Sequence, residues 1–159
     1  MSRQVLSDQR SAPVEAWVRL LRGQVALRRI FDGQLQADHE LTLNDFEALL
    51  TLARADGHMR RVDLAERLLL TPSGVTRLLD GLEQCGLVEK GSCPSDGRVT
   101  YAVLTEIGRD RLQEAADSHL AAVAALFEER YTPEELETLA DLLGRLPSAG
   151  TADASECRP

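Results

Sequence analysis

The feature that most constrains this chain is a change in the period of its apolar residues near residue 86. Between 75 and 82, valine and leucine recur every three or four residues, which is the spacing of one face of an α-helix. The segments 87–90 and 99–104 read instead as short strands, and the stretch 91–97 between them is rich in turn-forming residues. The sequence therefore predicts a helix followed directly by a β-hairpin.

Capping residues indicate where that helix begins. The Thr71 hydroxyl can accept a hydrogen bond from the first helical N–H groups, and Pro72 suits the first helical position because an N–H would have no partner there. A shorter helix precedes it, with Asp63 and Glu66 as a capping-box-like start. A short helix, a turn, a capped helix and a hairpin form the layout of a winged helix-turn-helix.

Further helices are predicted on both sides of this unit. Apolar periodicity places them at 14–35, 42–55, 105–130 and 132–146. Capping pairs support two of them, because Thr42 is followed by Asp45 and Thr132 by Glu135. The expected fold class is mainly α with a small β-hairpin wing.

These elements fit one domain over residues 1–147. The winged lobe spans about 42–104, and flanking helices span about 14–36 and 105–147. Residues 148–159 are mostly small or polar and are expected to form a disordered tail.

Composition excludes several functional classes. The chain has no run of eighteen apolar residues and no signal-peptide pattern at its amino terminus, so we expect a cytoplasmic protein without membrane contact. Cys85, Cys93 and Cys157 lack metal-ligand spacing, so we expect reduced thiols and no metal. Neither a nucleophile–histidine set nor a Gly-rich phosphate loop is suggested, so an enzyme or a bound cofactor is not expected.

The net charge of −8 argues at first against contact with nucleic acid. The acid is unevenly distributed, however. From residue 102 onward, five arginines face twelve acidic residues, whereas residues 58–101 carry six basic and six acidic groups. A surface that meets phosphates is therefore expected in the middle of the chain.

The amino end of the helix that begins at Thr71 carries residues suited to base recognition. Arg77 can bridge the two acceptors of guanine, and Ser73 or Thr76 can bond either base, while Thr also offers a methyl group to thymine. Two structural alternatives remain open. Thr71 and Ser73 also suit simple capping, and Arg77 could pair with Asp80 or Asp96.

The hairpin supplies further candidate DNA contacts. Arg98 at its turn suits a narrow minor groove, whose negative potential attracts arginine. Lys90 is a candidate phosphate contact. Asp96 would be repelled by phosphate, so its expected role is to hold Arg77 or Arg98 in place.

Three linked motifs closely resemble the MarR family of bacterial transcription regulators. They are the stretch from Val62 through Thr71-Pro72-Ser73 to Val88, the wing Asp96-Gly97-Arg98, which matches Asp-x-Arg, and Leu104-Thr105-Glu106-Ile107-Gly108-Arg109, which matches Leu-Thr-x-x-Gly-Arg. The likeness spans about residues 14–147. It implies a homodimer in which the flanking helices interlock, and binding to double-stranded DNA at a pseudo-palindromic operator with half-sites about 34–36 Å apart.

The resemblance also implies a regulator that a small aromatic effector controls, with repression as the expected effect on transcription. Trp17, Phe46 and Glu47 are the candidate pocket residues, although a Trp and a Phe at helical spacing are more typical of a core. Two alternatives stay open. One is redox sensing through Cys85 or Cys93, and the other is a winged-helix interaction module that does not bind DNA.

Overall fold

The computed structural model describes residues 11–93 and 95–147, and the tail predicted at 148–159 lies outside the described residues. The elements are, in chain order, α2 (Ala12–His39), α3 (Leu43–Arg54), β1 (His58–Arg60), α4 (Arg61–Arg67), α5 (Pro72–Gln84), β2 (Val88–Ser92), β3 (Thr100–Leu104), α6 (Glu106–Glu128) and α7 (Pro133–Gly144). The predicted fold class, mainly α with a small β wing, is confirmed.

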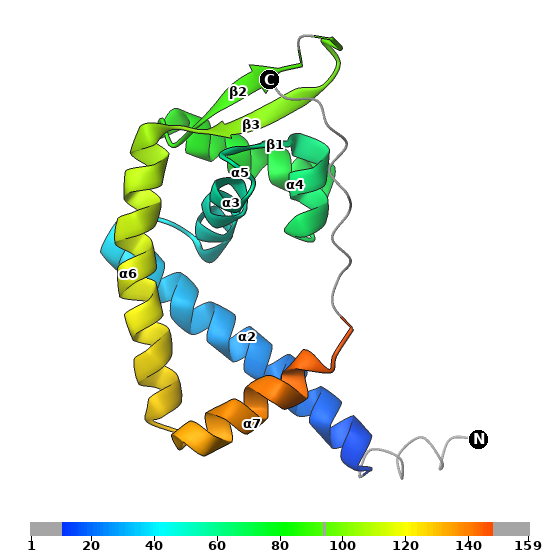
Figure 1. The fold of residues 1–159 in the computed structure, drawn as a ribbon, viewed down its shortest axis with the longest axis vertical. Coiled ribbons are helices and arrows are strands. Elements are labelled where there is room, and N and C mark those ends of the chain that lie inside the picture. Colours follow the sequence, from blue (N-terminus) through cyan, green and yellow to red (C-terminus); the bar gives the residue numbers. More distant parts are fainter. Residues whose placement is uncertain (1–10, 94, 148–159) are drawn as a thin grey trace, which may run out of the picture.

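The elements divide between a lobe and a set of flanking helices. In Figure 1, α3, α4, α5 and the sheet lie together at one end, and α2 and α6 extend away from them. Helix α7 follows at the end of α6 that is far from the sheet. Within the described residues, no helix is both long and apolar enough to span a membrane.

The sheet has three strands in the order β1-β3-β2, and both pairs are antiparallel. The β2–β3 pair is the predicted hairpin, in which Lys90 faces Ala102 across the ladder. Strand β1 was not predicted, because three residues are too few to show an alternating pattern. It forms because β3 offers a free edge, where Met59 pairs with Ala102.

Side-chain caps define most helix starts as predicted. The Thr42–Asp45 and Thr132–Glu135 pairs both form complete capping boxes, and Thr71 accepts from the Gly74 N–H at 3.1 Å. The expected capping box at Asp63 is wrong. Helix α4 starts earlier, and the Asp63 carboxylate binds the Arg60 guanidinium instead, at 2.6 and 2.8 Å.

The first long helix extends further than its sequence predicts. Although Gly23 and Gly33 lower its intrinsic helix propensity, α2 continues to His39 and ends at Glu40 in the left-handed conformation. The burial of Phe31 and Leu35 in the core accounts for this extension, since packing outweighs the helix penalty of about 1 kcal/mol for one glycine.

The core lies inside the lobe and at its junction with α2 and α6. Its fully buried large side chains are all leucines, at 35, 49, 52, 64 and 79. By contrast, α7 has no buried residue. The lobe is therefore closed around its own core, whereas the flanking helices keep apolar surface exposed.

The first turn of α6 fixes this helix to the lobe. Thr105 caps α6 through the Gly108 N–H and also donates to the Gly86 carbonyl at 2.7 Å. Gly108 packs so closely on the residue before β2 that a Cβ there would collide with the Leu87 carbonyl oxygen. The Arg109 side chain occupies the space that a Cβ on Gly57 would need. The Leu-Thr-x-x-Gly-Arg motif thus forms the joint that holds the start of α6 against the lobe.

Candidate nucleic-acid interface

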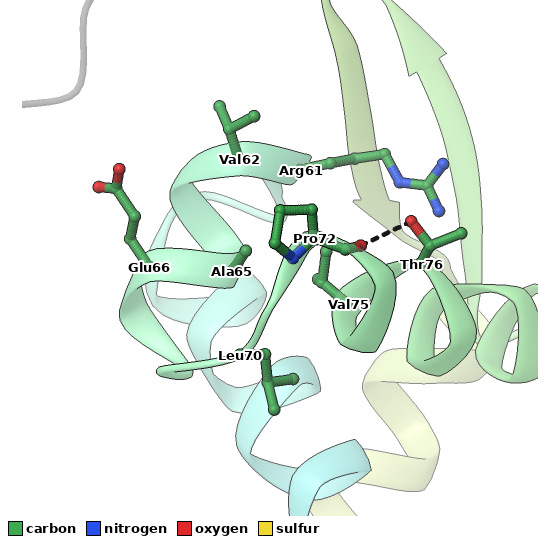
Figure 2. Close-up of a pocket in the computed structure, with 8 residues that line it drawn as sticks. All are labelled: Arg61, Val62, Ala65, Glu66, Leu70, Pro72, Val75 and Thr76. Atoms are coloured by element: carbon green, nitrogen blue, oxygen red, sulfur yellow. Dashed lines mark hydrogen bonds between the residues drawn. The ribbon is translucent and has the colours of Figure 1, made fainter.

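A tight turn connects α4 to α5. The Leu70 N–H donates to the Ala65 carbonyl at 2.9 Å, and Leu69 adopts a positive φ of 54°. This conformation is costly for a residue with a side chain, and it leaves Leu69 82% exposed. The turn leads into α5, whose first residue, Pro72, lies beside α4 in Figure 2.

Helix α5 has one buried face and one exposed face. Val75, Leu79 and Leu82 enter the core. The residues of α5 predicted to read DNA, Ser73, Thr76 and Arg77, lie on the exposed face, as does the supporting residue Pro72. The structure therefore brings the predicted helical site residues together on one accessible surface.

The three hydroxyl groups at the start of α5 already make hydrogen bonds. Thr71 Oγ1 accepts from Gly74 N, as expected for a cap, and lies 3.2 Å from Ser73 Oγ. Thr76 Oγ1 donates to the Pro72 carbonyl at 2.9 Å (Figure 2). Thr76 and Pro72 also line a hollow of about 370 Å³ between α4 and α5.

Arg77 differs from these hydroxyls. Over the described ranges, its exposed guanidinium has no hydrogen bond and no ion pair. Asp80 and Asp96 are the two partners that the sequence suggested for Arg77, and neither pairs with it. Asp80 lies 3.9 Å from Arg61, and Asp96 accepts a backbone N–H of the wing. The cation is thus available to a partner outside the chain.

The wing turn is held by Asp96. Its Oδ1 accepts the Arg98 backbone N–H at 3.0 Å, and its carbonyl accepts the Val99 N–H at 3.1 Å. The Arg98 side chain is exposed. Asp96 therefore positions Arg98 through the backbone rather than by pairing with a guanidinium.

A group of charged side chains connects α4, α5 and the wing. The Arg61 Nη2 lies 3.9 Å from Asp80 Oδ1 and 4.0 Å from Glu83 Oε1, and Lys90 Nζ lies 3.5 Å from Glu83 Oε2. Arg61 Nη2 is buried and makes no hydrogen bond within the described residues. Arg61 and Lys90 thus offset the negative charges of Asp80 and Glu83 on α5. No feature of the sequence predicted this role for Arg61.

The three predicted pocket residues lie in different surroundings. Phe46 is buried against His119, with ring centroids 4.9 Å apart, and Glu47 binds Arg28 at 3.1 Å. Trp17 is 59% exposed, and it precedes Arg28 on α2 by eleven residues, or about 16 Å along the helix axis.

A polar hollow of about 280 Å³ lies next to the Glu47–Arg28 pair, lined by Arg28, Arg29, Asp32, Leu43 and Asn44. The His119 ring packs between Phe31 and Phe46. Burial lowers the pKa of His119 below its usual range, and the nearby Glu47 acts in the opposite direction.

The two described cysteines differ in state. Cys85 is an exposed free thiol at the carboxyl end of α5. Cys93 in the wing is buried and disulfide-bonded, so the expectation of reduced thiols is wrong for this residue. An odd count of three cysteines still permits one disulfide, which is why composition did not decide the point.

The order α4, turn, α5 and β2–β3 hairpin defines the winged helix-turn-helix class of DNA-binding proteins. The exposed face of α5 carries hydroxyls and an arginine that has no partner among the described residues, and the wing presents a second arginine. Residues 39–99 match the model of the MarR family. The chain is 30% identical to the HTH-type transcriptional regulator MhqR of Bacillus subtilis, over 76% of this chain and 83% of that protein.

Two further relatives agree. The HTH-type transcriptional repressor YetL of Bacillus subtilis is 32% identical over 69% of this chain and 66% of its own length. The crystal structure of Sco3205, a MarR family transcriptional regulator from Streptomyces coelicolor in complex with DNA, is 29% identical with a TM-score of 0.74, and covers 91% of this chain and 93% of that chain.

This chain belongs to the MarR family. It is a DNA-binding transcription regulator rather than an enzyme, as its sequence predicts.

Proposed function

We propose that this regulator reads a specific, pseudo-palindromic operator in double-stranded DNA as a homodimer in the cytoplasm, and represses transcription until a small aromatic ligand releases it. The proposal of sequence-specific reading depends on one observation, the exposed guanidinium of Arg77. A guanidinium that is exposed on α5 and has no partner among the described residues fits the paired acceptors of a guanine in the major groove.

The other site residues take supporting roles. Ser73 and Thr76 meet base edges beside Arg77, whereas Thr71 and Pro72 set the start and direction of α5. Asp96 holds the wing turn so that Arg98 enters the neighbouring minor groove. Lys90 contacts phosphate, and it must exchange its contact with Glu83 to do so.

Exposed apolar side chains support the homodimer. They gather on the flanking helices, at Trp17, Leu20, Leu21, Val25, Ile30, Leu120, Leu142 and Leu143. A second copy that covers them would make residues 14–36 and 105–147 the dimerisation region, with the winged lobe at 42–104. The acidic carboxyl-terminal helices would then lie away from DNA. Two copies also compensate for a DNA-facing segment whose formal charges cancel.

The junction of α2, α3 and α6 supports the effector proposal. Phe46 and Glu47 lie there, beside the polar hollow at Arg28 and Asn44. A small aromatic ligand bound there would contact both the lobe and the flanking helices, and so could change the spacing of two lobes. Trp17 would take part only through the arrangement of the dimer, since it is distant along α2 from Arg28. The name of YetL as a repressor supports the proposed direction of regulation.

An electrophoretic shift assay with DNA from upstream of this protein's own gene, at two salt concentrations, tests the proposal. We expect a complex that weakens steeply with salt, because phosphate contacts release counterions. Absence of a shift even at low salt would favour an interaction module without DNA binding.

Variants separate the proposed roles. Arg77→Ala is expected to abolish sequence preference, whereas Lys90→Ala weakens binding to all sequences alike. Glu83→Gln is the matched control for Lys90, because it removes the internal partner of the ammonium group and is expected to strengthen binding to all sequences. Equal behaviour of Arg77→Ala and Lys90→Ala would contradict this division of roles.

The exposed Cys85 thiol favours a redox-sensing regulator as the second candidate. If oxidation controls this protein, peroxide treatment will release DNA from the native protein and not from Cys85→Ser. Release from both proteins, or from neither, would reject Cys85 as the sensor.

A further inference from the structure

The way Thr76 is bonded within α5 limits how this residue can recognise a base. Threonine has two groups that can reach a base edge, a hydroxyl and a methyl. The Thr76 hydroxyl donates its only proton to the Pro72 carbonyl at 2.9 Å, one helical turn back. To donate to a base instead, it would have to break this bond.

We propose that Thr76 reads DNA through its methyl group, which contacts the C5-methyl of a thymine, and that its hydroxyl donates no hydrogen bond to a base. This inference rests on the proposed function, because it assumes that the exposed face of α5 enters the major groove. Thr76 would thereby select a thymine by its C5-methyl group.

The geometry of the side chain holds the methyl group in place. Hydroxyl and methyl share the same Cβ, so the bond from Oγ1 to the Pro72 carbonyl also fixes the direction of Cγ2. In Figure 2, the methyl lies on the side of Cβ opposite the dashed bond. The residue is exposed, so this apolar group is available for contact.

The neighbouring residues divide the work of recognition with Thr76. The Thr71 hydroxyl holds the helix start through Gly74 and so is engaged in capping. Arg77, next in the chain, has a guanidinium that no described residue pairs with and that can bond a base. Polar recognition by Arg77 beside apolar recognition by Thr76 predicts an operator half-site in which a guanine and a thymine lie close together.

The test uses a DNA duplex that the full-length wild-type chain selects from a randomised library. Each thymine of the duplex is then replaced singly by deoxyuridine, which removes only the C5-methyl. At one thymine of each half-site, we expect wild-type affinity to fall about fourfold, the factor that corresponds to one buried methyl group.

Two substitutions separate the methyl from the hydroxyl. Thr76→Val keeps a methyl and removes the hydroxyl, so it is expected to retain both the affinity and the deoxyuridine penalty. Thr76→Ser keeps the hydroxyl and removes the methyl, so it is expected to lose about fourfold in affinity on the thymine duplex and to be insensitive to deoxyuridine.

Thr51 provides the matched control. Its hydroxyl makes the same bond to a carbonyl four residues back, Glu47, at 2.7 Å, but it lies on α3 and not on α5. Thr51→Val and Thr51→Ser are expected to leave DNA affinity unchanged. A change as large as that at Thr76 would mean that altering such a bond affects the helix generally, which would overturn the inference.

The remaining outcomes are distinct. If Thr76→Val loses affinity while Thr76→Ser keeps it, the hydroxyl is the reading group and the inference is wrong. If no thymine is sensitive to loss of its methyl, the inference is also wrong, although the proposed function stands. If the wild-type chain selects no sequence, the proposed function fails and the inference fails with it.

Discussion

The winged lobe and the flanking helices carry similar leucine patterns but use them differently. In the lobe, Leu49, Leu64 and Leu79 are fully buried. On the flanking helices, Val25 is 57% exposed and Leu120 is 64% exposed, although both follow helical spacing. The difference arises because the lobe elements fold onto one another, whereas the flanking helices diverge. Apolar periodicity therefore identifies a face that needs cover and does not identify what covers it.

The largest expected effect on the free energy of unfolding comes from comparing a leucine of the lobe with a leucine of the flanking helices. Leu79→Ala removes a fully buried side chain and is expected to lower the free energy of unfolding by about 3 kcal/mol at any protein concentration. Leu143→Ala on α7 is expected to matter only where chains associate, so its effect disappears on dilution. Urea unfolding at two concentrations measures both. Equal losses in dilute protein would contradict the division between the two regions.

Glycines provide the next comparison. Gly108→Ala places a Cβ against the Leu87 carbonyl at the joint between α6 and the lobe, and is expected to cost about 1–3 kcal/mol. Gly33→Ala on the exposed side of α2 meets no atom within 4 Å, and is expected to stabilise by about 1 kcal/mol. Thermal unfolding of the two variants measures the difference. A loss for Gly33→Ala would show that a second chain packs closely there.

Ion pairs in the two regions are expected to differ less in their contribution to the free energy of unfolding. The Arg60–Asp63 pair in the lobe has two short hydrogen bonds and partly buried side chains, so Asp63→Asn is expected to cost about 1 kcal/mol. The Asp141–Arg145 pair on α7 is mostly exposed, and Asp141→Asn is expected to cost less than about 0.5 kcal/mol. Chemical denaturation at low and high salt compares them. A larger loss for Asp141→Asn would place α7 in a buried interface.

The smallest expected effect is a pH dependence at the boundary between the regions. Burial between Phe31 and Phe46 lowers the pKa of His119 from its usual 6.5, so the folded state favours the neutral imidazole. The neutral His119 ring therefore gives its full stabilisation of the folded state above about pH 6.5, the pKa of the unfolded state. This stabilisation is lost as the pH falls through the lower pKa of the folded state. The melting temperature of the wild type is expected to fall more between pH 7.5 and 5.5 than that of His119→Gln. Identical slopes would exclude His119 as the cause.

The sequence by itself determined the order of the elements, most helix starts and the hairpin. These features depend on bonds between residues close in the chain, such as Thr71 with Gly74 and Asp96 with Arg98. The exposed positions of the predicted DNA-facing residues follow from the same local spacing. These parts were readable because a cap or a turn needs no distant partner.

Only the tertiary structure decided features that depend on distant partners. Strand β1 exists because β3 lies beside it, where Leu104 N donates to Gly57 O at 2.7 Å across nearly fifty residues. Arg61 meets Asp80 and Glu83 only because of how the helices cross. A linear pattern carries no information about such crossings. Under the proposed function, the bases that α5 would read are likewise set by which of its local groups the fold leaves unbonded and exposed.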